Sequence, residues 1–133
     1  MDESIKTVMI VDDEEFIRQS FVDYFEDCLW RTIPVESGEQ ALEILNHEKP
    51  QGIIVDVRLP GMNGNEFIRQ AYNKIKDTIF IIYTGSPEFI IPKDLLTLPN
   101  VSDTLFKKGE RDLTDIKNEL VKLIQKNIYK NYS

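Results

Sequence analysis

Short apolar runs alternate along the chain with longer segments in which apolar residues recur every three or four positions. Short runs bounded by turn residues are typical of strands buried on both faces, and the longer spacing is typical of helices with one buried face. The pattern predicts five strands, at residues 8–11, 32–35, 52–57, 78–84 and 103–106. Five helices are predicted to alternate with them, at residues 14–29, 37–46, 67–75, 93–98 and 112–127.

Local signals refine three of these elements. Pro34 has no N–H to donate, so the second strand is placed at an edge of the sheet. Ser37 and Gln40 have the spacing of a capping box, which opens the second helix. Prolines interrupt residues 86–100 and leave room for only one short helix there.

Five alternations of strand and helix predict an α/β fold with a doubly wound parallel sheet that is covered on both faces. No repeat, low-complexity segment or linker divides residues 1–133, so we expect a single domain. In such sheets, ligands bind beyond the carboxyl ends of the strands. Functional side chains are therefore expected at the carboxyl ends of the strands.

The composition of the chain disfavours several classes of function. The chain has 133 residues, a net charge of −7 and a pI near 4.7, and this charge disfavours direct binding to nucleic acid or to an anionic membrane. The lone Cys28 forms no internal disulfide, and no Cys/His cluster suits zinc. The first residues are polar and no apolar run is long enough to span a bilayer, so we expect a cytoplasmic protein.

Charged and hydroxyl side chains stand at the carboxyl ends of four predicted strands: Asp12 and Asp13 after the first, Asp56 near the end of the third, Thr84 at the end of the fourth and Lys107 after the fifth. Three converging carboxylates repel one another unless a cation compensates them. Oxygen ligands without His or Cys select Mg²⁺ or Mn²⁺. A hydroxyl and an ammonium opposite the metal suit a phosphoryl group, and an aspartate beside the metal is a suitable nucleophile toward phosphorus.

Five motifs occur in one order along the chain: IVDDE at 10–14, SGEQAL at 37–42, IVDVRLPGMNG at 54–64, IYTG at 82–85 and LFK at 105–107. In this order and at these spacings the sequence resembles the receiver domain of two-component response regulators, over nearly its whole length. The resemblance implies a flavodoxin-like, five-stranded sheet of order 2-1-3-4-5 with five helices. It also implies a signalling switch rather than an enzyme that turns over a substrate.

The resemblance further implies a role for each matched residue. Asp56 would accept a phosphoryl group from a phosphohistidine on a sensor histidine kinase or a histidine phosphotransfer protein. Asp13 would bind Mg²⁺ directly, Asp12 largely through water, and the backbone carbonyl of Arg58 would complete the protein ligands. Thr84 and Lys107 would each hold a phosphoryl oxygen.

Regulation and output are implied in the same way. Arg58 and Ser86, each two residues past a site residue, would tune the lifetime of the acyl phosphate. Phosphorylation would rearrange the face formed by the fourth helix, fifth strand and fifth helix, which would bind a downstream protein or output domain that the sequence does not identify. The resemblance also allows a homodimer.

Two positions depart from the family pattern. Thr104 stands three residues before Lys107, where the family usually has Tyr or Phe, and Lys108 follows it where Pro is usual. We therefore expect a switch around the fifth strand without burial of an aromatic ring at Thr104. These departures leave the phosphorylation chemistry itself unchanged.

Three alternatives are weighed against this interpretation. A small aspartyl-nucleophile phosphohydrolase of the haloacid dehalogenase type has a second Asp two residues after the nucleophile, where this chain has Arg58. A flavodoxin-like flavin carrier needs a phosphate-binding loop rich in Ser, Thr and Gly after the first strand, where residues 12–15 are all acidic. A receiver-like scaffold that works by binding alone stays open.

Overall fold

Strands and helices alternate throughout the computed structural model, which describes residues 5–109 and 112–132. The strands are β1 (Thr7–Val11), β2 (Arg31–Val35), β3 (Gly52–Asp56), β4 (Ile79–Thr84) and β5 (Val101–Lys107). The helices are α1 (Glu15–Asp27), α2 (Gly38–Ile44), α3 (Gly64–Tyr72), α4 (Lys93–Leu96) and α5 (Leu113–Tyr132). Every predicted element is present, with ends that differ by a few residues.

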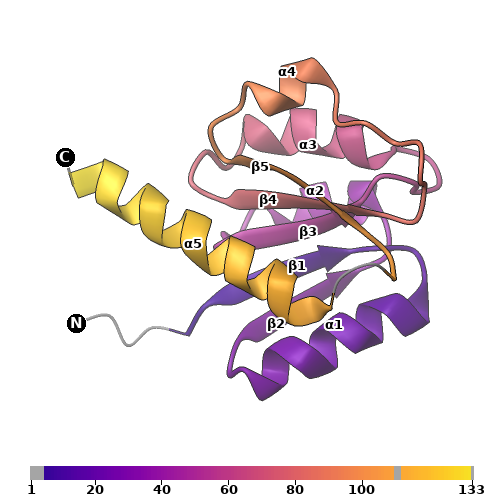
Figure 1. Cartoon of the computed structure of the whole chain (residues 1–133), viewed down its shortest axis with the longest axis horizontal. Coiled ribbons are helices and arrows are strands. Elements are labelled where there is room, and N and C mark those ends of the chain that lie inside the picture. Colours follow the sequence, from indigo (N-terminus) through magenta and orange to yellow (C-terminus); the bar gives the residue numbers. More distant parts are fainter. Residues whose placement is uncertain (1–4, 110–111, 133) are drawn as a thin grey trace.

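The five strands form one parallel sheet in the order β2-β1-β3-β4-β5, which confirms the predicted fold (Figure 1). β2 lies at an edge, as Pro34 requires, because an edge strand tolerates a missing N–H on its free side. Ser37 caps α2, and its side chain accepts a hydrogen bond from the backbone N–H of Gln40.

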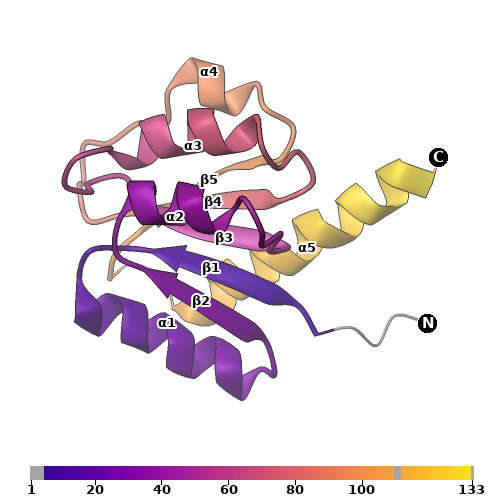
Figure 2. The same ribbon diagram turned by 180° about the vertical axis from the view of Figure 1, so that it is seen from behind.

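Helices cover both faces of the sheet, α1 and α5 on one and α2, α3 and α4 on the other (Figures 1 and 2). The core under α1 and α5 is centred on large buried side chains, Phe21, Phe25, Phe106, Ile116 and Leu120. The core on the other face is built around Phe67, Ile68, Phe80, Ile82 and Leu95. Because both faces are buried, the carboxyl ends of the strands are the part of the sheet that is left open for chemistry.

The path of β5 differs from a regular strand. Phe80 of β4 pairs with Val101 of β5, and Ile82 pairs with Leu105. A step of two residues along β4 thus corresponds to a step of four residues along β5. β5 therefore contains two extra residues at this point, a bulge that shifts the register of everything after it. After the shift, Lys107 lies opposite Thr84 at the end of β4.

Two apolar residues that continue the helical spacing of the buried faces of α1 and α5 are exposed. Phe16, in the first turn of α1, is 81% exposed, and Ile128, late in α5, is 46% exposed. Helical spacing alone marks a face and does not show where the covered surface ends. Among the described residues, no helix combines the length and the apolar character that crossing a membrane requires.

Candidate functional site

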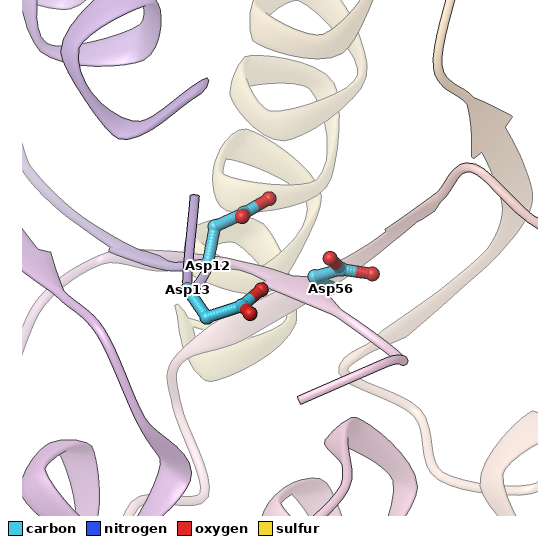
Figure 3. Close-up of side chains that lie close together, drawn as sticks. All are labelled: Asp12, Asp13 and Asp56. Carbon is cyan, nitrogen blue, oxygen red and sulfur yellow. The ribbon is translucent and has the colours of Figure 1, made fainter. Parts of the chain in front are cut away.

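Three carboxylates meet at the carboxyl ends of β1 and β3 (Figure 3). Asp12 and Asp13 directly follow β1, and Asp56 is the last residue of β3, the neighbouring strand. One oxygen from each carboxylate lies within 4.8 Å of the others. Asp12 and Asp56 are 1% and 5% exposed, whereas Asp13 is open to solvent.

Backbone hydrogen bonds orient the two buried carboxylates. Asp12 Oδ1 accepts a bond of 2.8 Å from the backbone N–H of Glu14, and Asp56 Oδ1 accepts one of 3.1 Å from the N–H of Arg58. Each carboxylate therefore has its second oxygen, Oδ2, left for a cation. Gly64 allows the chain to turn tightly after Asp56, because a Cβ at Gly64 would overlap the carbonyl oxygen of Asp56.

The cation at this position is Lys108. Its Nζ lies 3.2 Å from Asp12 Oδ2, 3.2 Å from Asp56 Oδ2 and 3.0 Å from Glu14 Oε2. The contact with Asp12 is an ion pair without hydrogen-bond geometry, while Asp56 and Glu14 both accept hydrogen bonds from the ammonium. One ammonium group thus offsets charge on three carboxylates.

The electrostatic effects follow from burial and from these contacts. Burial raises the pKa of the Asp12 carboxyl, although the N–H of Glu14 and the Lys108 ammonium both act to lower it. Burial alone would lower the pKa of Lys108, but the hydrogen bond to Glu14 and the charges of Asp12 and Asp56 outweigh it and raise that pKa. Lys108 is therefore protonated throughout the physiological range.

Lys107, the lysine predicted for this role, points elsewhere. Its Nζ donates a hydrogen bond of 2.6 Å to the backbone carbonyl of Pro87 in the loop between β4 and α4. The bulge in β5 places Lys107 opposite Thr84, and the backbone N–H of Lys108 donates to the Thr84 carbonyl. The structure thus places Lys108, and not the predicted Lys107, beside the carboxylates, because successive side chains of a strand point to opposite faces of the sheet.

This correction also moves the predicted switch position. If the lysine at the site is Lys108, the residue three positions before it is Leu105 and not Thr104. Leu105 is partly buried and packs against the core beneath α3 and α4. Neither residue is aromatic, so the expectation that no ring is buried at this position applies equally to Leu105. The residue after the lysine becomes Gly109, whose φ is +85°.

The remaining predicted residues lie around the mouth of the site. Thr84 is fully buried, and its Oγ1 accepts a hydrogen bond of 3.0 Å from the backbone N–H of Ser86, which leaves its own hydrogen free to donate. The Arg58 guanidinium donates to Ser86 Oγ at 3.0 Å, and that hydroxyl donates to Glu88 Oε2 at 3.1 Å. Arg58 and Ser86 are thus brought together, two residues past Asp56 and Thr84 respectively.

The donor set fits a hard divalent cation. Asp12, Asp13 and Asp56 supply only carboxylate oxygens, which bind Mg²⁺ or Mn²⁺ in preference to softer metals. The Lys108 ammonium contacts Oδ2 of Asp12 and of Asp56, and the Thr84 hydroxyl stands at the end of β4, the strand next to β3. An ammonium and a hydroxyl suit the oxygens of a phosphoryl group.

Sequence reasoning missed two participants. Lys108 was assigned to the position after the site, and Glu14 was counted only among neighbouring acids. The only sequence signal for Lys108 is the pair of adjacent lysines, which allows either one.

Comparisons with known proteins support one family. The model of the response regulator receiver domain matches residues 8–120. Sporulation initiation phosphotransferase F of Bacillus subtilis is 33% identical over 63 residues, which are 47% of this chain and 51% of that protein. The matched region thus spans about half the length of this relative.

Solved structures show the same fold. A CheY-like response regulator receiver domain from Methanospirillum hungatei aligns with a TM-score of 0.77 at 22% identity, over 92% of this chain and 99% of that chain. The response regulator TrrA of Thermotoga maritima, in complex with Mg²⁺-BeF, aligns with a TM-score of 0.75 at 24% identity, over 90% and 99% of the two chains. The family match, together with the carboxylates and the lysine at the carboxyl ends of the strands, leads to one assignment. The chain belongs to the response regulator receiver domain family of two-component signalling systems.

Proposed function

We propose that Asp56 is the phosphoacceptor of this receiver domain and that it takes its phosphoryl group from a phosphohistidine on a sensor kinase or phosphotransfer protein. The observation that carries the proposal is the meeting of Asp56 with Asp12, Asp13 and Lys108. Burying an ionised carboxylate that is 5% exposed at the end of an apolar strand destabilises the fold unless another charge compensates it. At a phosphoacceptor site a cation compensates this charge, and the carboxylate acts as the nucleophile.

The metal expected at such a site is Mg²⁺, or Mn²⁺ in its place. Asp12, Asp13 and Asp56 would hold it with the backbone carbonyl of Arg58, and the ion would neutralise charge on the phosphoryl oxygens. The geometry supports this ligand set, because Asp12 and Asp56 each keep one oxygen free of backbone hydrogen bonds. The Mg²⁺ complex of TrrA, a structural neighbour, is consistent with it.

The transfer step uses the chain's own groups for attack and for charge stabilisation. A carboxylate oxygen of Asp56 attacks phosphorus while the P–N bond to the histidine breaks, and the electron pair of that bond leaves on the imidazole nitrogen. Thr84 donates its hydroxyl hydrogen to one phosphoryl oxygen, and Lys108 pairs with another. Lys107, with its ammonium on the Pro87 carbonyl, holds the neighbouring loop instead.

Arg58 and Ser86 would tune how long the acyl phosphate survives. Their hydrogen bond joins the loop after β3 to the loop after β4 across the mouth of the site, and Glu88 extends it. Water must pass this mouth to hydrolyse the acyl phosphate. A substitution that opens it should therefore change the rate of dephosphorylation.

Phosphorylation would change the binding of a downstream partner at the face formed by α4, β5 and α5. Thr84 lies at the end of β4 and pairs with Lys107 of β5, so a movement of its hydroxyl toward a phosphoryl group acts directly on β5. The downstream partner, a homodimer on this face and a cytoplasmic location stay predictions. We further propose that residues 1–133 work as one receiver domain.

The proposal is tested by intact-mass measurement after incubation with phosphoramidate and Mg²⁺. We expect one added phosphoryl group in the wild type and none in Asp56→Asn or in the presence of a metal chelator. An adduct that persists in Asp56→Asn would place the phosphate elsewhere, and the phosphoacceptor assignment would be withdrawn.

The two lysines provide a matched pair for the second test. Lys108→Met should load phosphoryl groups much more slowly than the wild type, because it removes the ammonium beside Asp56. Lys107→Met should load at a rate close to that of the wild type. The reverse order would return the phosphoryl-binding role to Lys107.

A further inference from the structure

Two adjoining hollows lie at the amino ends of the strands, the opposite end of the sheet from Asp56. The larger one, of about 490 Å³, lies between the start of β4, the residues before β5 and the second half of α5. Figure 1 shows this half of α5 beside the amino ends of the strands. The smaller one, of about 260 Å³, lies between the residues that precede β3 and those that precede β4. Lys76 and Asp77 line both hollows, so the two meet at these residues.

The charge around the two hollows is positive, although the chain as a whole has a net charge of −7. Four lysines line them, Lys49 and Lys74 in the smaller hollow, Lys126 in the larger one and Lys76 in both. Asp77 is the single acid among the lining residues. Within the described part of the chain, no carboxylate forms an ion pair with any of these lysines. This end of the sheet therefore attracts anions.

The type of cation indicates the type of anion. All of the cations that line the hollows are lysines, and lysine binds phosphate as a point charge, whereas a planar carboxylate is matched by the planar fork of arginine. A phosphoryl group has three acceptor oxygens and nearly two negative charges, so it can contact more than one ammonium group at once. Lysines that come from three separate segments thus favour a ligand with phosphoryl groups.

The larger hollow also offers apolar surface. Tyr72, Pro99 and Leu123 line it, and its volume is in the range of small-molecule sites. Such sites are mostly apolar, with a few polar groups that fix the orientation of the ligand. A ligand with a charged end and a flat body would therefore place its charged end at Lys76, where the hollows meet, and its body in the larger hollow.

Two carboxamides in the larger hollow have an acceptor oxygen to offer. Asn100 Nδ2 donates to the backbone carbonyl of Thr78 at 2.6 Å, and Asn127 Nδ2 donates to that of Asp77 at 3.0 Å. Asn100 is 3% exposed, and its Oδ1 is buried without a hydrogen-bond partner among the described residues. Because a buried acceptor without a partner destabilises the fold, an N–H donor that reaches this oxygen would stabilise it.

We propose that the two hollows form one binding site for an organic phosphate of the nucleotide class. The phosphoryl groups lie against Lys74 and Lys76, and the base lies in the larger hollow, where Asn100 and Asn127 accept hydrogen bonds from its N–H groups. A nucleobase fits this description because it is flat and carries such donors. Asp56 lies at the other end of the strands, so this site is separate from the phosphoacceptor.

The test is isothermal titration calorimetry with three probes: ADP, pyrophosphate and adenosine. Mg²⁺ is omitted and the protein carries Asp56→Asn, which keeps the phosphoacceptor site out of the measurement. Pyrophosphate has the charge without the base, and adenosine has the base without the charge. We expect ADP to bind at least about tenfold more tightly than either of them. Amide chemical shifts should change with ADP around Lys76, Asp77 and Asn100.

Variants separate the two ends of the ligand. Lys76→Gln should raise the Kd of ADP on the order of tenfold, the effect expected for loss of a hydrogen bond to a charged group. Lys93→Gln is the charge-matched control, because Lys93 is exposed on α4 and lines neither hollow. Asn127→Leu should weaken the binding of ADP and leave the binding of pyrophosphate unchanged.

Four results would overturn the proposal. These are no binding of ADP, equal losses in Lys76→Gln and Lys93→Gln, an affinity for ADP no higher than that for pyrophosphate, and shift changes confined to the carboxyl ends of the strands. A single-stranded oligonucleotide that binds more tightly than ADP would overturn it too, since the lysines would then form a nucleic-acid surface. Because Asp56 takes no part in the binding, each of these results leaves its assignment as phosphoacceptor unchanged.

Discussion

Substitution of Lys108 by Met tests the electrostatic balance of the site through stability. Lys108 is the one described cation whose ammonium contacts Asp12, Asp56 and Glu14 together. Met keeps much of the length and apolar stem of the side chain but removes the charge. The two buried carboxylates, Asp12 and Asp56, are then left facing each other without compensation.

The magnitude follows from burial. Removing one partner of a fully buried ion pair costs about 3–5 kcal/mol. The Lys108 side chain is 20% exposed and that of Glu14 is 58% exposed, so solvent screens part of the interaction. We therefore expect Lys108→Met to lower the free energy of unfolding by about 2–3 kcal/mol at neutral pH. Lys107→Met, which loses one hydrogen bond to a backbone carbonyl, should cost at most about 1 kcal/mol.

The pH dependence has a definite sign. Burial raises the pKa of Asp12 above its unfolded value, so the cost of keeping Asp12 charged is absent below that value and grows as pH rises through the folded pKa. Loss of Lys108 removes a charge that lowers this pKa. The stability difference between Lys108→Met and the wild type should therefore shrink as pH falls from about 7 to about 4.

The assay is unfolding by urea. It is followed by far-UV circular dichroism and by the fluorescence of the single tryptophan, Trp30. The m value should be the same in all proteins, so that midpoints report stability. Added Mg²⁺ should stabilise Lys108→Met more than the wild type, because the divalent ion replaces the missing charge without competing with an ammonium. The reasoning is refuted if Lys107→Met loses as much stability as Lys108→Met, or if Mg²⁺ stabilises the wild type more.

Two further predictions concern packing, and both are measured by urea midpoints. Gly64→Ala should destabilise the fold by about 2–4 kcal/mol, because its Cβ would overlap the backbone of Asp56, whereas Gly85→Ala, whose nearest neighbour is a flexible side chain at 3.4 Å, should be much milder. Equal effects would contradict the close approach. Leu120→Ala should cost about 2–5 kcal/mol, since Leu120 is fully buried in the core beneath α5, while Ile128→Ala, at a position 46% exposed, should cost less than about 1 kcal/mol. A small effect at Leu120 would show that the core relaxes around the cavity.

The fold could be predicted because its strongest sequence signals are local. The apolar runs that became β1, β3 and β4 are too short for helices and too apolar for exposed strands. Each is followed by an amphipathic segment or a turn, so the alternation that defines a doubly wound sheet appears directly in the sequence. Pro34 even indicated which strand lies at the edge, since a missing N–H is a property of the residue itself.

Three of the site residues could be found for a related reason. Asp12, Asp13 and Asp56 stand at the ends of buried strands, and parallel strands bring their carboxyl ends to one edge of the sheet. Sequence position alone then implies that their side chains converge. The hydrogen bonds that leave one oxygen of Asp12 and one of Asp56 free for a cation could not be inferred in this way.

Residue patterns thus determine the alternation of strands and helices, the buried cores and the convergence of three carboxylates, because each depends on a short segment and on general rules of parallel sheets. Residue patterns do not determine which lysine lies at the site. Lys107 and Lys108 are adjacent and chemically identical, and successive side chains of a strand point to opposite faces of the sheet, so the choice between them depends on which face of β5 each one occupies. That face, and the distance that β5 extends beside β4, are set by strand pairing, so only the tertiary structure directs Lys108 to Asp56 and Lys107 to the carbonyl of Pro87.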